Sequence, residues 1–289
     1  MRNPNLAAEL AATGHNELGF DSVTPYFSIV QESSGLGCEI QWETKDNWPT
    51  VSMTRPLWRE PVDVNLPTGF LEHPDSSVVP RSIEILRGEF HDEVASVGEV
   101  GGLSPLAYQL FGGERFLRMT LDEPDMAARC LDRLKEIAIT FGLAQIAAGT
   151  DALTVAEGVI GDLCSGEYYR RFLLELHQEM AERLDVTLIL HICGDTIDRM
   201  DYVDTKGAAI FHFDSKSVPE QAKAIVGDRI GLVGNIDNEQ TMYARGPEVV
   251  RSEVRACLDA GIDMIAPGYA IPQATRLENL VEISRACEG

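Results

Sequence analysis

The sequence lacks long apolar runs and has few cysteines. No stretch approaches the roughly 18 uninterrupted apolar residues that a membrane-spanning helix needs. The opening run MRNPNLAAELAATG contains no apolar core of a secretory signal. The six cysteines are scattered, without the density of a disulfide scaffold. These features argue against a membrane protein and against a disulfide-stapled secreted domain, and they predict a cytoplasmic protein.

Basic residues are also scarce. The chain has 24 Lys and Arg against 46 Asp and Glu, which gives a formal net charge of −22. A field of that sign repels phosphate backbones and anionic lipid surfaces, so we expect neither nucleic acid nor a membrane as partner. The same charge weighs against a polyanionic substrate.

Short apolar runs alternate with segments of helical periodicity along most of the chain. Strands are predicted at 21–27, 93–100, 152–157, 187–193, 208–214, 229–236 and 263–268, and helices at about 122–149, 165–183, 197–205, 217–226, 241–260 and 275–287. Such alternation is typical of βαβ units with a parallel sheet. The chain of 289 residues shows no repeat and no linker, so residues 1–289 are predicted to form a single (β/α) barrel domain with seven barrel-type strands.

Local signals add detail to this framework. Asn3-Pro4 predicts a helix start and a first helix through about residue 17. Capping boxes are predicted at Ser217–Glu220 and Thr275–Glu278, each with a hydroxyl at the N-cap and a Glu at the third helical position. Residues 37–54 are predicted to be an inserted β-hairpin around the turn cluster Lys45-Asp46-Asn47, and residues 55–80 an irregular loop.

Polar residues collect where the predicted strands end. In a parallel barrel the chemistry lies at the carboxyl ends of the strands. Reading those ends in order gives Glu99, Glu157, His191, Cys193, His212, Asp214, Asn235, Asp237 and Tyr269. An apolar strand ending in one polar group is common, but a collection on one face indicates a functional pocket.

The most specific pattern is His191-Ile192-Cys193-Gly194. Residues two apart on a strand project to the same side, so the imidazole and the thiol point together. They form half of a zinc site, and Gly194 lets the chain turn without blocking it. The alternative is an ordinary buried cysteine beside a core histidine. The spacing alone slightly favours that alternative, and the position at the end of a barrel strand makes the two about even.

Each of the remaining strand-end residues could have either a functional role or an ordinary structural one. Glu157 could be a carboxylate supporting the site, a general base or simply the end of a surface strand. His212 and Asp214 share a side, and a histidine in that position is more often a satisfied core residue. Tyr269 is more often a packed aromatic whose hydroxyl reaches a partner. Glu157, Asp214 and Tyr269 are the candidate catalytic residues. The pocket is expected to be lined by Glu99, His212, Asn235 and Asp237.

The run TLILHICGDTIDRMDYVDTKGAAIFHFDSK, followed by AKAIVGDRIGLVGNID and AGIDMIAPGYAIPQATRLENL, resembles the zinc- and corrinoid-dependent methylcobalamin:coenzyme M methyltransferases. These enzymes belong with the uroporphyrinogen decarboxylase superfamily. The resemblance extends from about Asn5 to the C-terminus, and its specific parts are HICG, VGNID and the APG-x-x-I-P loop. It implies a TIM-type (β/α)8 barrel from which the family's first N-terminal strand is missing.

The resemblance also implies a chemistry. A methyl group would move between a corrinoid cofactor, carried by a partner protein, and a small thiol, methylated substrate or folate, as in one-carbon metabolism. In that family zinc, bound by the His and Cys of H-x-C and by a distant Cys, activates the thiol. His191 and Cys193 match the first two ligands.

One position departs from the family. Its distant Cys lies in a loop resembling APGCGI, and here Tyr269 stands at that place. A neutral phenol, with an ordinary pKa of about 10, is a poor zinc ligand. Three alternatives stay open: a third ligand from elsewhere, a weak or different metal, or no metal. Candidate third ligands are His212, Asp214, Glu157 and Cys164.

Two rival functions remain. A decarboxylase of the same superfamily would need an arginine cluster for its many carboxylates, and the family places it in an N-terminal segment that this chain lacks. A non-catalytic accessory paralogue would account for both the missing ligand and the missing strand. Neither the methyl donor and acceptor nor the oligomeric state follows from the sequence.

Overall fold

The computed structural model describes residues 2–25, 28–42, 48–52, 55–158, 160–203 and 207–288. Within these ranges the chain divides into two compact units, each treated separately below. The first unit contains residues 1–12, 22–156 and 182–186, and the second contains residues 13–21, 157–181 and 187–289. The prediction of one barrel domain over residues 1–289 stays a prediction.

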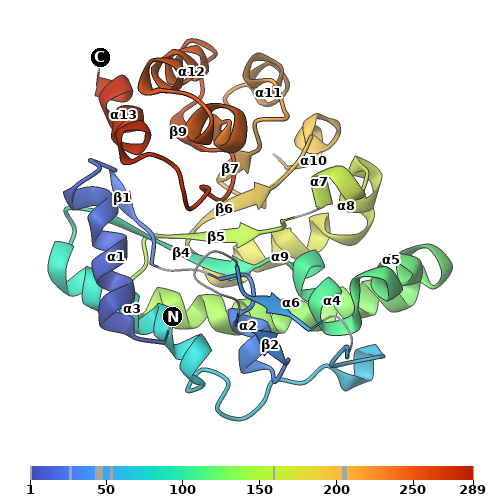
Figure 1. Ribbon diagram of the computed structural model, residues 1–289. Coiled ribbons are helices and arrows are strands. Elements are labelled where there is room, and N and C mark those ends of the chain that lie inside the picture. The colour runs from blue at the N-terminus through green and yellow to red at the C-terminus, as the bar shows by residue number, and fades with distance from the viewer. Residues whose placement is uncertain are drawn as a thin grey trace. The chain divides into compact units, whose positions relative to one another are not determined.

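The first unit is built on three parallel strands. They are β1 (Ser22–Val23), β4 (Ala95–Gly101) and β5 (Ala152–Ala156), with β4 paired to both of the others (Figure 1). Its helices are α2 (Gln31–Gly35), the 3-10 turn η1 (Pro61–Asp63), α3 (Pro74–Phe90), α4 (Leu103–Phe111), α5 (Gly113–Asp122) and α6 (Pro124–Ala147), and α1 (Pro4–Asn16) begins in it. A short antiparallel hairpin joins β2 (Ile40–Gln41) to β3 (Thr50–Val51).

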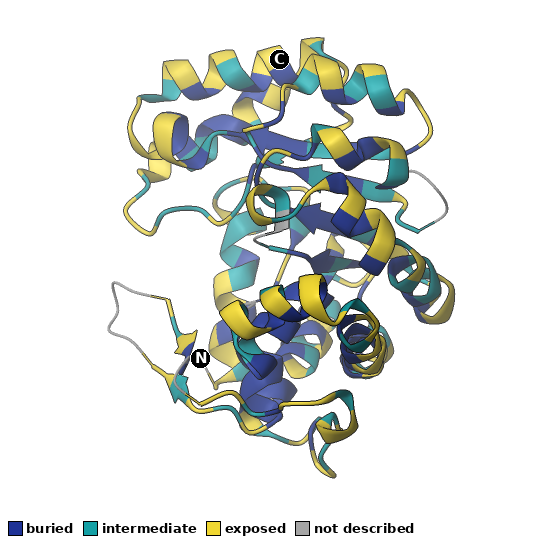
Figure 2. Ribbon diagram, turned by 90° about the vertical axis from the view of Figure 1, so that its right-hand side faces the viewer, coloured by how far each residue is buried: buried dark blue, intermediate teal, exposed yellow. Residues whose placement is uncertain are grey.

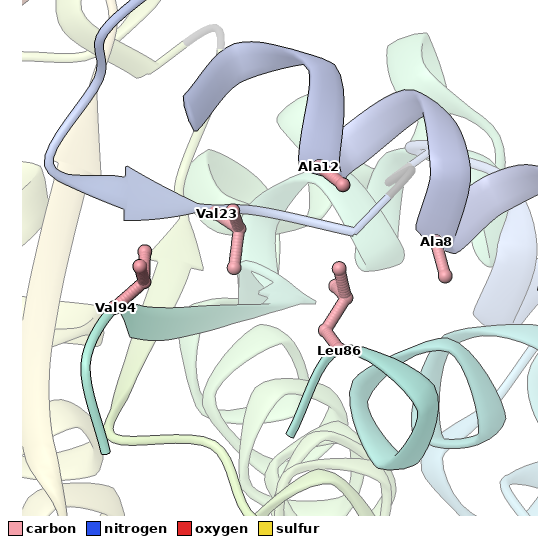
Figure 3. Close-up of a cluster of buried hydrophobic side chains, with 5 residues drawn as sticks. All are labelled: Ala8, Ala12, Val23, Leu86 and Val94. Atoms are coloured by element: carbon pink, nitrogen blue, oxygen red, sulfur yellow. The ribbon is translucent and has the colours of Figure 1, made fainter. Parts of the chain in front are cut away.

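Apolar side chains from β1, α1 and α3 meet in one core of the first unit. Ala8 and Ala12 of α1 pack with Val23, Leu86 and Val94, and all five are nearly inaccessible to solvent (Figure 3). The small alanines let α1 come close to the strand, and burial of the larger side chains supplies the hydrophobic stabilisation. This core fixes the start of β4, whose other end carries Glu99.

The second unit contains four parallel strands in sequential order. They are β6 (Thr187–Ile192), β7 (Ile210–Phe213), β8 (Gly231–Ile236) and β9 (Met264–Pro267), each paired to the next. Its helical segments are α7 (Ile160–Leu163), α8 (Gly166–Phe172), α9 (Leu174–Leu184, which ends in the first unit), η2 (Ile197–Arg199), α10 (Met200–Val203), α11 (Pro219–Val226), the π-helical η3 (Asn238–Tyr243), α12 (Pro247–Asp259) and α13 (Leu277–Glu288).

The helices of the second unit are amphipathic and pack on its strands through their apolar faces. In α12, Val250, Val254 and Cys257 are buried, and this helix packs on β8 and β9. Buried and exposed segments alternate along such helices in Figure 2. No helix among the described residues is long and apolar enough to span a membrane.

The parallel α/β class is confirmed, and a strand overlaps each of the seven predicted ranges. In the range 21–27 the strand covers only Ser22–Val23, and residues 26–27 lie outside the described residues. The hairpin is confirmed by its two strands, while Lys45, Asp46 and Asn47 lie outside the described residues. Asn3 caps α1 as predicted, because its Oδ1 accepts the N–H groups of Asn5 and Leu6.

Several predicted helix features were wrong. Residues 55–80 are not all loop, because α3 begins at Pro74, and α4 and α5 were not predicted at all. The segments 165–183 and 241–260 are each interrupted rather than continuous. Ser217 does not cap α11: the helix begins at Pro219, so Val218 is the N-cap, and the Ser217 hydroxyl accepts the Thr196 N–H instead. Thr275 does not cap α13, which begins at Leu277.

Candidate functional site

The predicted His–Cys pair lies together at the carboxyl end of β6. His191 Nε2 is 3.0 Å from Cys193 Sγ. His191 is buried, and its Nδ1 has no hydrogen-bond partner among the described residues. Burial and the neighbouring His212 hold the pKa of the His191 imidazole well below its usual value. The imidazole is therefore neutral and presents a nitrogen directly to the thiol.

His212 enters the site through strand register. His191 and His212 are Cα partners in the parallel β6–β7 ladder, so their side chains lie on one face. Their ring centroids are 4.3 Å apart. His212 Nε2 is 2.8 Å from the carbonyl oxygen of Pro267, and since a carbonyl only accepts, Nε2 carries the hydrogen. Burial lowers the pKa of His212 as well.

Asp214 is a structural anchor for the turn after Cys193. Its Oδ2 accepts the Gly194 N–H at 2.9 Å, and its Oδ1 accepts the Lys216 N–H at 3.1 Å. Asn235 supports it, because the Asn235 amide donates to the carbonyl oxygens of Asp214 and Ser217. These bonds join the ends of β6, β7 and β8 and fix the direction of the Cys193 side chain.

Two glycines allow the backbone to close tightly behind the thiol. Gly194 has a φ of +93°, a conformation that other residues adopt only with strain. A Cβ atom on Gly161 would lie 1.9 Å from the Cys193 carbonyl oxygen, which no side chain tolerates. The Asp162–Lys216 ion pair lies beside this turn, and Asp162 also accepts the Asp195 N–H.

Glu157 is fully buried and forms a line of polar contacts with His177 and Tyr169. Its Oε1 is 3.0 Å from His177 Nε2, and His177 Nδ1 is 3.3 Å from the Tyr169 hydroxyl. The Glu157 N–H donates to the His191 carbonyl oxygen at 2.8 Å. Glu157 therefore holds the backbone of His191. Sequence reasoning missed His177, because a lone histidine inside an amphipathic segment carries no distinguishing signal.

Tyr269 is held through its main chain. Its N–H donates to Asn238 Oδ1 at 3.2 Å, and the Asn238 amide donates to its carbonyl oxygen at 2.7 Å. Burial and the neighbouring Glu239 raise the pKa of Tyr269 to about 12, so the phenol stays protonated. Asp237 caps η3 by accepting the N–H groups of Glu239 and Gln240. Asp237 therefore has a structural role.

The first unit holds a second group of candidate residues. Glu99, near the end of β4, is half-buried, and burial together with Glu32 raises its pKa to about 8. Glu32 was not among the predicted residues, because nothing in the run QESSG indicates that its carboxyl reaches β4. Its Oε1 accepts the Gly101 N–H at 2.6 Å.

The donors present do not complete the family's zinc site. Cys164 contributes its carbonyl oxygen to the buried Arg199, and His212 Nε2 is engaged by Pro267. Across the described ranges, no group of three or more His, Cys, Asp and Glu residues is placed to hold a metal ion. His191 and Cys193 are two donors, and a structural or catalytic zinc site has at least three protein ligands.

Comparison with known proteins gives a consistent relationship over the whole chain. The family profile "Uroporphyrinogen decarboxylase (URO-D)" matches residues 1–289. A methylated-thiol–coenzyme M methyltransferase of Methanosarcina mazei is 29% identical over 98% of this chain and 76% of its own length. The methylcobamide:CoM methyltransferase MtaA of Methanosarcina barkeri is 29% identical over 96% of this chain and 82% of its own.

Solved structures agree with this relationship. A methyltransferase from Methanosarcina mazei superposes with a TM-score of 0.93, at 28% identity over 99% of this chain and 86% of that one. A B12-independent methionine synthase from Shewanella superposes with a TM-score of 0.67 at 14% identity, which shows a shared fold alone. In sequence, a uroporphyrinogen decarboxylase of Carboxydothermus hydrogenoformans, compared without a structure, is 26% identical over 98% of this chain and 83% of its own length.

Proposed function

Because the chain belongs to the uroporphyrinogen decarboxylase family, and its similarity to that family's methyltransferases spans nearly its whole length, we propose that it transfers a methyl group between a corrinoid and a small thiol. The observation that carries this proposal is the His191–Cys193 pair, with its 3.0 Å contact at the end of β6. A decarboxylase of polycarboxylates would have no evident use for a thiol beside an imidazole there.

The proposed step is a nucleophilic displacement on the methyl carbon. The substrate thiol gives up its proton to solvent water, and the thiolate sulfur forms a bond to carbon with its own electron pair. The carbon–cobalt bond breaks and leaves its pair on the metal, so methyl-cobalt(III) of the corrinoid substrate becomes cobalt(I). The products are a methyl thioether and the reduced corrinoid. In the reverse direction a methylated substrate would deliver its methyl group to cobalt(I).

The chain's own residues would position the reactants. His191 and Cys193 present a neutral imidazole and a thiol to the substrate, with the turn behind them held by Asp214 and the His191 backbone held by Glu157. Such fixed geometry contributes to catalysis by holding the sulfur where it can attack. Where zinc is bound, His191 and Cys193 would hold it, and it would lower the pKa of the substrate thiol.

A direct test mixes the purified chain anaerobically with free methylcobalamin and a panel of thiols that includes coenzyme M. Transfer is followed by the spectral change from methylcob(III)alamin to cob(I)alamin and by detection of the methylated thiol. We expect turnover with at least one thiol, and its loss in His191→Gln and Cys193→Ser. Cys287→Ser, which alters an exposed cysteine, serves as the matched control. Absence of transfer with every thiol, including when a corrinoid protein presents the methyl group, would refute the proposal.

Zinc remains a separate prediction, and elemental analysis of protein purified without chelator tests it. About one zinc per chain, lost in His191→Ala and Cys193→Ala, would assign both residues as ligands and require a third donor to move into place. Native protein that stays free of zinc after zinc is added back would remove the metal from the mechanism. In that case we would attribute the absence of zinc to Tyr269, which stands where the family's motif has its third ligand, a cysteine.

The proposal extends to partners and location. A corrinoid protein would present the methyl group, with a small thiol, a folate or a methylated compound as the other substrate. All six cysteines are thiols that take part in no disulfide, which fits a reducing cytoplasm. The net charge of −22 favours small neutral or cationic substrates over polyanions.

A further inference from the structure

Arg199, the last residue of η2, is a buried charged side chain in the second unit. It is 1% exposed and is among the largest fully buried side chains of the described residues. Charged side chains are almost never fully buried unless they are paired, because the charge loses its hydration. A guanidinium at this depth therefore depends on specific partners, and those partners show what it holds in place.

The partners of this guanidinium lie in residues 160–166, which follow β5. Arg199 Nη2 donates to the carbonyl oxygen of Cys164 at 2.7 Å and to that of Gly161 at 3.3 Å. Arg199 Nε donates to Asp198 Oδ1 at 2.8 Å, and Asp198 Oδ2 accepts the Gly166 N–H at 2.7 Å. A guanidinium suits this arrangement because its donors point in fixed directions within one plane. Arg199 and Asp198 together therefore hold α7 and the start of α8 against η2.

The same segment packs directly against the turn that carries the Cys193 thiol. The Gly158 carbonyl oxygen accepts the Cys193 N–H at 3.0 Å. A Cβ atom on Gly161 would lie 1.9 Å from the Cys193 carbonyl oxygen, so the two backbones touch with no side chain between them. Asp162 Oδ1 accepts the Asp195 N–H at 3.4 Å. The position of residues 193–195 is therefore set in part by the position of residues 158–162.

A cavity of about 510 Å³ lies beside the guanidinium, within the second unit. Its walls come from α7, the residues after α7 and η2, and they include Gly161, Cys164 and Arg199. Among the described residues, its lining does not include His191 or Cys193. The cavity therefore gives a small solute a route to the position of the guanidinium that does not pass through the candidate site.

We propose that Arg199 is a positioning residue for methyl transfer, which fixes residues 160–166 and, through them, the Cys193 thiol. This inference rests on the proposed function. Arg199 forms and breaks no bond in the reaction; it keeps the backbone behind Cys193 in one place. Accurate placement matters because a displacement of about 1 Å, caused by a substitution far from the reacting atoms, can reduce the rate on the order of 100-fold.

The effect on the turn can be measured without any reaction, by hydrogen–deuterium exchange of its amide groups. We expect peptides that contain residues 193–195 to exchange on the order of 10-fold faster in Arg199→Ala, because the hydrogen bonds of a charged group to this backbone are lost. Peptides from β8 and β9 should exchange as in the wild type. Arg199→Lys keeps the charge without the planar donors, and it is measured in place of Arg199→Ala if that variant does not fold.

Arg229→Ala is the matched control for this exchange experiment. Arg229 also donates to two backbone carbonyl oxygens, those of Ile225 and Val226, but it does so at the end of α11. Its removal should leave the exchange of residues 193–195 unchanged. Unchanged exchange of these residues in both Arg199 variants would overturn the proposal, and so would faster exchange throughout the second unit, because general destabilisation is not local positioning.

The role in catalysis has a second readout. We expect kcat/KM for methyl transfer from methylcobalamin to a thiol to fall on the order of 100-fold in Arg199→Ala, and to stay at the wild-type value in Arg229→Ala. Added guanidinium chloride, at concentrations too low to unfold the chain, should restore part of the activity by entering the vacated position, whereas sodium chloride should not. Wild-type activity in folded Arg199→Ala, or a loss that guanidinium leaves unchanged, would overturn the positioning role. If the wild-type chain methylates no thiol, the proposed function fails, while the exchange experiment still decides whether Arg199 fixes the turn.

Discussion

Replacing Glu99 by Gln should change how the stability of the first unit depends on pH. The folded chain holds the Glu99 proton up to about pH 8, whereas the ordinary value is 4.5. The folded state therefore binds more protons than the unfolded state between these values. Stability is highest below the ordinary pKa and falls as the pH rises toward about 8. Glu99→Gln lacks this ionisation and should lose less stability over the same range.

The magnitude follows from the pKa difference. Each pKa unit corresponds to about 1.4 kcal/mol, so the difference between 4.5 and about 8 corresponds to roughly 5 kcal/mol. The free energy of unfolding of Glu99→Gln, relative to wild type, should thus increase by about 1.4 kcal/mol per pH unit across that window. Above it the difference should stay constant, because Glu99 is then ionised in both states.

Tryptophan fluorescence during urea unfolding is a suitable assay. The three tryptophans, Trp42, Trp48 and Trp58, all lie in the first unit, so their emission reports the unit that contains Glu99. Unfolding curves for wild type, Glu99→Gln and the exposed control Glu93→Gln would be recorded at several pH values. If wild type and Glu99→Gln lose stability in parallel as pH rises, Glu99 is not a buried proton-holding group and the reasoning is wrong.

Three further substitutions test the packing around the two candidate sites. His177→Leu removes the imidazole 3.0 Å from the fully buried Glu157 carboxyl and should lower the stability of the second unit by about 3 kcal/mol; a loss below 1 kcal/mol by circular dichroism would contradict this. Leu86→Ala opens a cavity in the first unit's core and should cost about 2–5 kcal/mol in the fluorescence assay. Gly161→Ala places a methyl group against the Cys193 carbonyl oxygen and should abolish methyl transfer even where the chain still folds; full activity would show that the turn relaxes freely.

The strands could be predicted from the sequence because each is a short apolar run between turn signals. The run TLILHI is buried at four of its six positions, and GLVGNI behaves similarly. Helix α4 was missed for a physical reason: seven of its nine residues are buried, so it has no polar face to mark a helical period. Helix α2 has five residues, too few for any periodicity.

The site was predictable in part. Residues on one strand, such as His191 and Cys193, share a face by simple alternation, and their 3.0 Å contact confirms that step. Partners brought together by tertiary packing were not predictable. Glu32 reaches a backbone group 69 residues away, and His177 reaches Glu157 from a helix. Such contacts depend on how helices dock, which a single sequence does not encode in any local pattern.

Tyr269 stands where the resembling family has a cysteine. This difference changes the charge of the candidate site at His191 and Cys193 as well as the number of possible metal ligands. A phenol whose pKa is raised to about 12 stays neutral, so the site has one negative charge fewer than a site with a second cysteine thiolate. Loss of that charge weakens the attraction for a divalent cation more than the attraction for a neutral thiol. The neutral rings of His191 and His212 add no charge in compensation. Electrostatics and donor count therefore both predict weaker metal binding at this site than at one with two cysteine thiolates.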